Sequence, residues 1–271
     1  MNARAHREAN RPEVSKFYEG QFSRGHYAAG LDRAAASIVR EVVDERRLRD
    51  VRALEVGCGR GTLSDLTRWV GIDLALTAGT GIGRPFVCGS AGKLPFRSGQ
   101  FDFVFSINVL EHVGELDSAL EEIGRVTRPG GFVLLRPAWF CRPWAAQGYE
   151  VRSYSDLELS RRLVKATIPI RNSILYRLPG VLVRRMWREL GNAASGRARP
   201  LRYRRLQPNY EIFWQSDSDA CNSIDPHAVV LWFRQRGWEA IGRMRFLERI
   251  SIRSGPVLLR KPGACLPATS C

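Results

Sequence analysis

The sequence has no run of eighteen or more apolar residues, so it offers no candidate for a membrane-spanning helix. Its first eight residues are polar and charged, without the apolar centre of a secretory signal. Six cysteines are scattered along the chain and none forms a Cys-x-x-Cys pair, which argues against a zinc site and against a disulfide framework. We therefore expect a cytoplasmic protein with no metal.

Acidic residues are scarce relative to basic ones, and the imbalance is uneven. The chain has 42 Lys and Arg against 27 Asp and Glu, a formal net charge of +15. Residues 151–205 alone hold 14 Lys and Arg against 3 Asp and Glu. This basic segment fits an acidic substrate, an anionic membrane surface or nucleic-acid phosphates. It also fits an ordinary solvated surface that is rich in arginine.

The most informative feature of the chain is a glycine-rich turn. An apolar run ends at Gly57-Cys58-Gly59-Arg60-Gly61, and a second short apolar run ends at Asp73. The glycines allow a sharp turn and a close approach of a ligand to the main chain. Asp73 is placed to accept the two hydroxyls of a ribose. Glu55, just before the turn, would repel a pyrophosphate but suits a cationic ligand.

The segments 54–61 and 71–73 resemble motif I of the class I methyltransferases that use S-adenosylmethionine. Residues 87–96 resemble the loop after the third strand of that family, with Ser90 where the family commonly has Asp. Residues 101–113 resemble its fourth strand and the following loop, and residues 125–135 resemble its turn into the fifth strand. The resemblance implies a Rossmann-like α/β fold. The sheet should have seven mostly parallel strands with an antiparallel last strand, and a mainly helical basic cap should be inserted after strand five.

The expected organisation has five parts along the chain. They are an N-terminal helical flap (1–50), a cofactor-binding core (51–135), an inserted substrate cap (136–215), the end of the core sheet (216–262) and a C-terminal tail (263–271). Pro169, Pro179 and Pro200 should break the cap into pieces.

Apolar periodicity and turn residues place the expected elements. Helices are expected near 32–48, from the glycine turn to Arg68, and over 116–127, 159–166, 181–190 and 226–236. Strands are expected near 52–57, 70–73, up to Cys88, and over 101–106, 132–135, 239–246 and 250–259. Three glycines and a proline between Leu74 and Phe86 oppose the full helix that the family normally has there.

The resemblance implies S-adenosylmethionine as cofactor and S-adenosylhomocysteine as product. Asp73 should take the ribose hydroxyls, Ser90 should border the adenine, and Asn108 should offer its carbonyl to the methionine ammonium. Glu55 should reach that ammonium indirectly or order the turn. The expected cofactor-binding residues are Tyr18, Glu55, Gly57, Cys58, Gly59, Asp73, Leu74, Ser90, Ala91, Asn108 and Val109. Tyr18 belongs to an aromatic segment that could fold over the cofactor or simply pack on the sheet edge.

The candidate general base is His112, because it follows strand four and a histidine of near-neutral pKa can accept a hydroxyl proton. A structural role for His112 is the alternative. Asp217, Asp219 and His227 lie in a segment rich in acids and amides, which suits contacts to sugar hydroxyls or to a divalent ion on a sugar diol. Helix capping is the alternative for the acids of this segment. Asp225 before Pro226 fits a cap, and for Asp217 and Asp219 the choice between capping and substrate contact stays open.

Three functions are compatible with these features. The first is O-methylation of a small-molecule, sugar or natural-product acceptor, which could carry an anionic group. The second is methylation of RNA or another anionic polymer. The residues after strand four, Ser106 to Val109, differ from the Asn/Asp-Pro-Pro-Tyr pattern of base-amino methylation and make a nucleic-acid partner unlikely. The third is a non-catalytic protein that keeps the fold. Peripheral contact with a membrane is compatible with all three.

Overall fold

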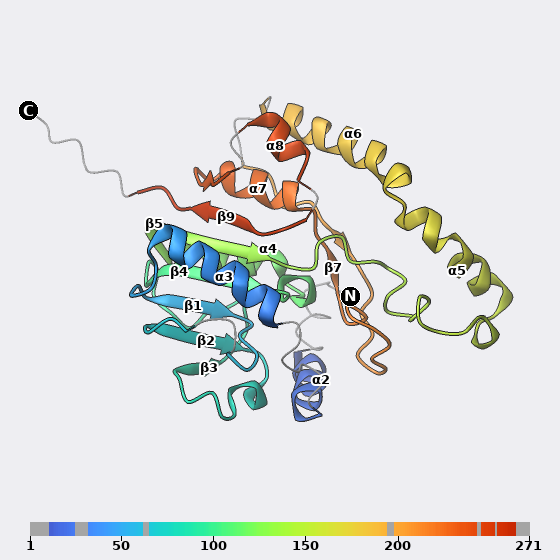
Figure 1. Ribbon diagram of the computed structural model, residues 1–271, viewed down its shortest axis with the longest axis horizontal. Coiled ribbons are helices and arrows are strands. Elements are labelled where there is room, and N and C mark those ends of the chain that lie inside the picture. The colour runs from blue at the N-terminus through green and yellow to red at the C-terminus, as the bar shows by residue number, and fades with distance from the viewer. Residues whose placement is uncertain are drawn as a thin grey trace, which may run out of the picture.

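The computed structural model describes residues 11–24, 32–61, 65–193, 198–242, 245–252 and 254–263. Its centre is a seven-stranded sheet with the order β3-β2-β1-β4-β5-β9-β8 (Figure 1). The strands are β1 (Ala53–Val56), β2 (Trp69–Asp73), β3 (Phe86–Cys88), β4 (Phe101–Ile107), β5 (Thr127–Arg136), β8 (Glu239–Ala240) and β9 (Val257–Arg260). Strands β1 to β5 pair in parallel, and β9 is antiparallel to both β5 and β8. The predicted fold class is confirmed.

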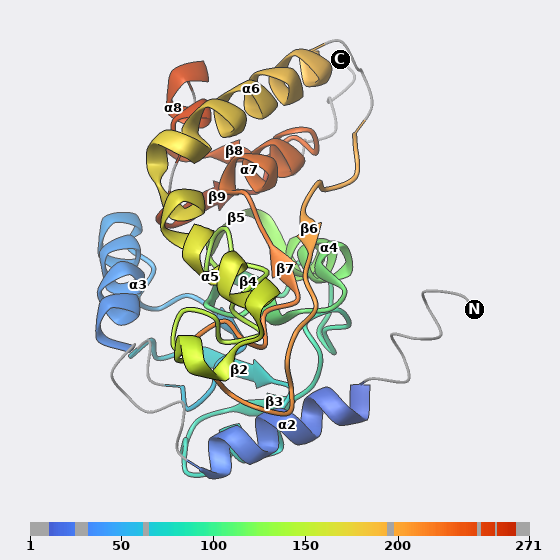
Figure 2. The ribbon, with the colours of Figure 1, turned by 90° about the vertical axis from the view of Figure 1, so that its right-hand side faces the viewer.

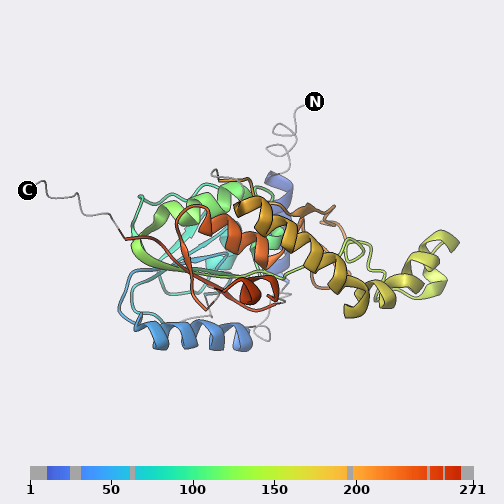
Figure 3. The ribbon, with the colours of Figure 1, turned by 90° about the horizontal axis from the view of Figure 1, so that it is seen from above.

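Helices cover both faces of the sheet (Figure 3). On one face α3 (Asp32–Arg46) packs Val39 and Val43 against Phe103 and Phe105 of β4. On the other face lie α4 (Leu116–Val126) and α7 (Pro226–Arg234), whose apolar residues pack against β4, β5 and β9. Each strand in the middle of the sheet is buried on both sides, because the alternating side chains of β4 point into one core or the other.

The remaining elements surround the carboxyl ends of the parallel strands or extend away from them. Helix α2 (Arg11–Ser23) lies beside β2 and β3 (Figure 2). The others are the 3₁₀ turns η1 (Leu76–Gly79), η2 (Leu110–His112) and η3 (Tyr154–Asp156), the helices α5 (Leu159–Asn172), α6 (Ile174–Ala193) and α8 (Phe246–Ile250), and the short strands β6 (Arg204–Arg205) and β7 (Asn222–Ser223). Among the described residues, no helix is both long and apolar enough to cross a bilayer.

Several predicted elements differ from the structure. Residues 65–68 are not helical, and residues 62–64 of that predicted helix lie outside the described part. The strand expected over 239–246 ends at Ala240 because Gly242 turns the chain at a φ of +68°, and residues 246–250 form α8. The last strand consequently begins only at Val257.

The prolines of the basic segment do not end its helices. Pro169 lies inside α5 and Pro179 inside α6, while the break between the two helices falls at Ser173. Each proline removes one hydrogen bond of the helix and leaves the neighbouring bonds intact. Both helices are therefore longer than the sequence pattern predicted.

Candidate functional site

A cavity of about 1150 Å³ opens at the carboxyl ends of β1, β2 and β4. In a parallel α/β sheet this edge is where ligands bind, because the loops that follow neighbouring strands meet there. Its lining includes Gly57 after β1, Asp73 at the end of β2 and Asn108 after β4. It also includes Tyr18 of α2 and His112 of η2, so segments distant in sequence share one space.

The glycine turn holds the main chain close to the cavity. Gly57 and Cys58 donate their N–H groups to the carbonyl of Ile72, at 2.8 and 3.1 Å, which ties the turn to β2. Gly57 has a φ of +74°, and a Cβ there would lie 2.2 Å from Cγ2 of Val109. Only glycine fits this position, because a side chain would be strained by the backbone and would also collide with Val109.

Asp73 is fixed by main-chain donors. Its Oδ2 accepts the N–H of Gly59 at 2.9 Å, and its Oδ1 accepts the N–H of Ala75 at 3.1 Å. Burial raises the pKa of Asp73, while these backbone hydrogen bonds act in the opposite direction. The carboxylate therefore stands at the cavity edge in a fixed orientation, as hydroxyl recognition requires.

Helix α2 closes one side of the cavity through an acid that sequence reasoning missed. Glu19 accepts the N–H groups of Leu76 and Thr77 at 2.6 and 3.0 Å, so it caps η1. Hydrogen bonds with Thr77 lower the pKa of Glu19. The only sequence signal was its place in the aromatic segment, two residues before Gln21 and next to Tyr18. The contact brings Tyr18 and Phe22 into the cavity lining.

A cluster of acids surrounds His112 inside the cavity. Its Nδ1 lies 3.2 Å from Oδ2 of Asp219, and its Nε2 lies 3.8 Å from Oε1 of Glu111. Tyr18 donates its hydroxyl to the same Oδ2 of Asp219 at 2.9 Å. Asp217 also lines the cavity, in a loop where its φ is +65°. The structure thus joins η2, α2 and the loop before β7 into one polar site.

The acids set the charge of His112. Burial alone would lower the pKa of His112, but the carboxylates of Asp219, Glu111 and Asp217 together raise it. Burial raises the pKa of Glu111 and of Asp217. Glu111, His112 and Asp217 offer ligand atoms within 4.8 Å of one another, so these residues could hold a cation. When His112 is protonated, its own positive charge lies among these acids and no bound cation is needed to balance them.

Comparison with known proteins matches the segment that supplies much of this cavity. Residues 54–135 match the family model described as a methyltransferase domain. Over these residues the chain is similar to methyltransferase domains. The match begins in β1 and ends in β5, so it contains the glycine turn, Asp73 and His112.

Curated relatives match part of the chain. The chain is 34% identical over 134 residues to phthiotriol/phenolphthiotriol dimycocerosates methyltransferase 1 of Mycobacterium ulcerans, covering 42% of this chain and 49% of the relative. It is 28% identical over 118 residues to a ubiquinone biosynthesis O-methyltransferase of Sinorhizobium medicae, covering 38% and 48%. The chain therefore matches about half the length of these curated relatives. A solved methyltransferase structure from Thermotoga maritima is 21% identical, with a TM-score of 0.38 and coverage of 45% and 60%.

S-Adenosylmethionine is the cofactor of this class of methyltransferase domain, and the cavity suits it. The turn at Gly57 has room only for Val109 beside it, and Asp73 presents a carboxylate at the cavity edge. The cavity lining includes most of the residues expected to hold the cofactor, namely Tyr18, Gly57, Cys58, Gly59, Asp73, Leu74, Ser90, Ala91, Asn108 and Val109. Asn108 adopts a left-handed φ of +54°, which turns the chain sharply after β4.

The structure places Glu55 apart from the other expected cofactor residues. It is buried, and its Oε2 accepts a hydrogen bond from the indole Nε1–H of Trp69 at 2.7 Å. The alternation of β1 sends Glu55 toward the core under α3, whereas Leu54 and Val56 face the opposite core. Glu55 is therefore not part of the cavity lining, and its expected role, to reach the ammonium indirectly or to order the turn, stays a prediction.

His227 also lies away from the cavity, which corrects its predicted role in substrate contact. Its side chain is fully buried in α7, and its Nε2 lies 3.2 Å from Oε1 of Glu189. Asp225 caps α7 by accepting the N–H of His227 at 3.0 Å, as its place before Pro226 indicated. The histidine is therefore drawn into the packing of α7 against α6, while Asp217 and Asp219 reach the cavity.

Proposed function

We propose that this protein methylates a hydroxyl group of a small-molecule acceptor with S-adenosylmethionine. One observation carries the proposal: the cofactor edge of the methyltransferase domain and the His112–Asp219 pair line the same cavity. The names of the relatives include both O- and C-methyltransferases, and the histidine–carboxylate pair favours an acceptor that must lose a proton.

Bound S-adenosylmethionine supplies an activated methyl group to this site. Gly57, Gly59 and Asp73 hold the cofactor end of the cavity, so the residues around His112 are left to position the acceptor. With Nδ1 of His112 facing Asp219, Nε2 is the nitrogen that accepts the acceptor's hydroxyl proton. Asp219 is a positioning residue, because it orients the imidazole and stabilises its protonated form.

Two arginines give the acceptor its chemical class. Arg142 and Arg177 line the cavity, and neither forms an ion pair among the described residues. Burial, and then the charge of Arg177, lower the pKa of Arg142. Two neighbouring guanidinium groups that repel each other are relieved by a bound carboxylate or phosphate. The acceptor proposed here therefore carries an anionic group.

Calorimetry and a methyl-transfer assay test the proposal together. Asp73→Ala should abolish measurable binding of S-adenosylmethionine, while Asp65→Ala, an exposed acid outside the cavity, should bind it normally. His112→Ala should bind the cofactor but lower kcat by roughly 10²- to 10⁴-fold. Acceptors can be found by screening an extract for molecules that take up a labelled methyl group from S-adenosylmethionine. For an anionic acceptor found in this way, Arg177→Gln should raise KM, and Arg68→Gln, at an exposed residue, should not. A wild-type protein that fails to bind S-adenosylmethionine would refute the function.

A further inference from the structure

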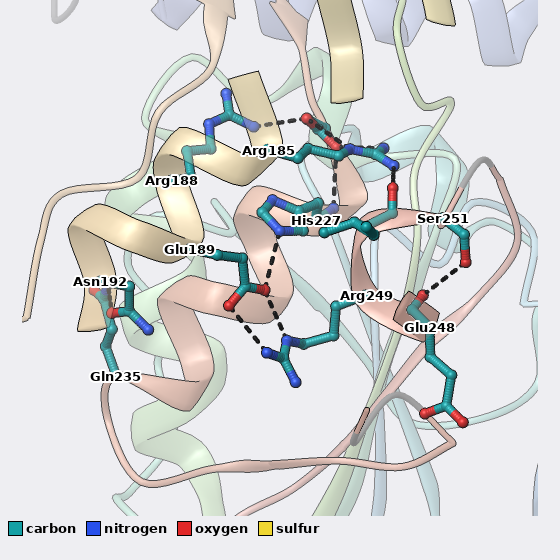
Figure 4. Close-up of polar contacts among 11 residues, drawn as sticks. Arg185, Arg188, Glu189, Asn192, His227, Gln235, Glu248, Arg249 and Ser251 are labelled. Atoms are coloured by element: carbon teal, nitrogen blue, oxygen red, sulfur yellow. Dashed lines mark hydrogen bonds and ion pairs between the residues drawn. The ribbon is translucent and has the colours of Figure 1, made fainter. Parts of the chain in front are cut away.

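Helix α6 carries two buried charged residues on the side that faces the protein. Arg185 and Glu189 are buried, although they belong to residue types that normally face water. Arg185 bonds Asp225 at 2.8 Å, and Glu189 bonds Arg249 of α8 at 2.8 Å (Figure 4). Arg188 reaches Asp225 at 2.6 Å as well. These ion pairs fix which face of α6 points inward.

The opposite face of α6 is apolar and exposed. Leu175 is 82% exposed and Trp187 is 70% exposed. The spacing from Leu175 to Val183, Met186 and Leu190 is eight, three and four residues, which places all four on one side of the helix. Helix α5 repeats the pattern, because Leu159, Leu163 and Ile170 are exposed at intervals of four and seven residues. We call these eight side chains the apolar stripe.

Basic residues flank the apolar stripe. Arg162, Arg171 and Arg184 are exposed, while Glu189 is the one acid between residues 159 and 193 and is already paired. The two helices form an arm that extends from the rest of the protein, so nothing described in the chain covers the outer side (Figures 1 and 3). An amphipathic helix with leucine and tryptophan on one face and arginine beside it is typical of helices that lie in a membrane interface.

We propose that the α5–α6 arm binds the surface of an anionic lipid bilayer, with the apolar stripe inserted among the headgroups. The positive charge of the arm favours an anionic lipid surface over a neutral one, because anionic lipids attract each nearby arginine. Trp187 and Tyr176, which are both exposed, are the residue types that favour the boundary between lipid and water. The arm lies on the bilayer, since no described helix can span one. This inference does not depend on methyl transfer.

Vesicle sedimentation of the full chain tests the arm. We expect binding to phosphatidylcholine vesicles that contain phosphatidylglycerol, much weaker binding to pure phosphatidylcholine, and release at high salt. The double variant Leu175→Gln/Trp187→Gln should lower the partition coefficient by about tenfold or more, because two exposed apolar anchors are lost. Arg171→Glu/Arg184→Glu should lower it by a similar factor on anionic vesicles only.

Leu76→Gln is the matched control. Leu76 is 64% exposed on η1, away from the arm, so its change to an amide should leave vesicle binding unaltered. Circular dichroism of every variant should match the wild type, since all these side chains are exposed. Absence of binding to anionic vesicles would overturn the proposal, as would equal binding by the arm variants. A dimer in light scattering that the Leu175→Gln/Trp187→Gln change dissolves would assign the stripe to a second copy of the chain instead.

Discussion

At the scale of single residues, the site depends on how neighbours set the charge of His112. A histidine with no partners in a buried cavity would lose its proton easily. Here Asp219 at 3.2 Å from Nδ1 leads the carboxylates that raise the pKa of His112. A group that must be neutral to accept a proton then works only when the pH exceeds this raised pKa.

The pH dependence of methyl transfer follows from that sign. The logarithm of kcat/KM should rise with pH until His112 is deprotonated, and Asp219→Asn should move this limb to lower pH because the carboxylate that raises the pKa is gone. The plateau rate should fall as well, since the amide no longer orients the imidazole. A pH–rate profile of both proteins is the measurement. Glu158→Gln, an exposed change outside the cavity, should leave the limb in place, and an Asp219→Asn limb that stays in place would exclude His112 as the base.

At the scale of elements, short turns replace helices where the chain passes the cofactor edge. Residues 74–86 contain the 3₁₀ turn η1, which the glycines and the proline of this segment foreshadowed. Glu19 of α2 caps this turn by accepting the N–H of Leu76. A helix from another part of the chain therefore holds the turn in place. The edge of the cavity is therefore held by contacts between elements rather than within one.

Two glycines with similar backbone angles allow the cost of a left-handed φ to be separated from the cost of a collision by a Cβ. Gly57 has a φ of +74° and Gly81 of +79°, but only at Gly57 would a Cβ meet neighbouring atoms. Gly81→Ala should cost roughly 1–2 kcal/mol through the left-handed backbone alone. Gly57→Ala should cost more, because Val109 must also move, and it should weaken cofactor binding. Urea unfolding measures both, and equal losses in the two variants would contradict the argument from the collision.

At the scale of the whole molecule, buried charges join the arm to the sheet-covering helices. Glu189 of α6 meets His227 of α7 and Arg249 of α8, and Asp225 meets Arg185 and Arg188 (Figure 4). Breaking one partner of such a buried set leaves an unpaired charge, which is costly. This network of ion pairs therefore determines how α6 packs against α7 and α8.

Acid should weaken this connection. Burial would raise the pKa of Glu189, but hydrogen bonds from His227 and Arg249 hold it at about 2, below the ordinary value of 4.5. A carboxyl whose folded-state pKa is depressed stabilises the fold above its unfolded value and loses that contribution as the pH falls toward the folded value. The urea midpoint of the wild type should thus fall between about pH 5 and pH 2. Glu189→Gln should be less stable at neutral pH and show a shallower decline, and identical slopes in the two proteins would refute this role.

Local patterns in the sequence were sufficient to predict the sheet and most of the residues that line the cavity at its edge. The glycine turn and Asp73 were readable because they lie close in sequence and obey fixed backbone requirements, and α4 follows from apolar residues at helical spacing. The hydrogen bond between Glu55 and Trp69 could not be predicted from the sequence, because it depends on which core that side of β1 faces.

The sequence by itself determined the fold class, a mostly parallel sheet with an antiparallel last strand, and the excess of positive charge. Only the tertiary structure decided which polar residues meet. Asp219 lies beside His112 although more than a hundred residues separate them in the sequence. His227, which the sequence pattern also indicated as a site residue, instead pairs with Glu189 in the core. The structure also decided that α6 buries Arg185 and Glu189 and exposes Leu175 and Leu190. The physical reason is that a periodic pattern identifies two faces of a helix, but long-range contacts choose which face turns inward.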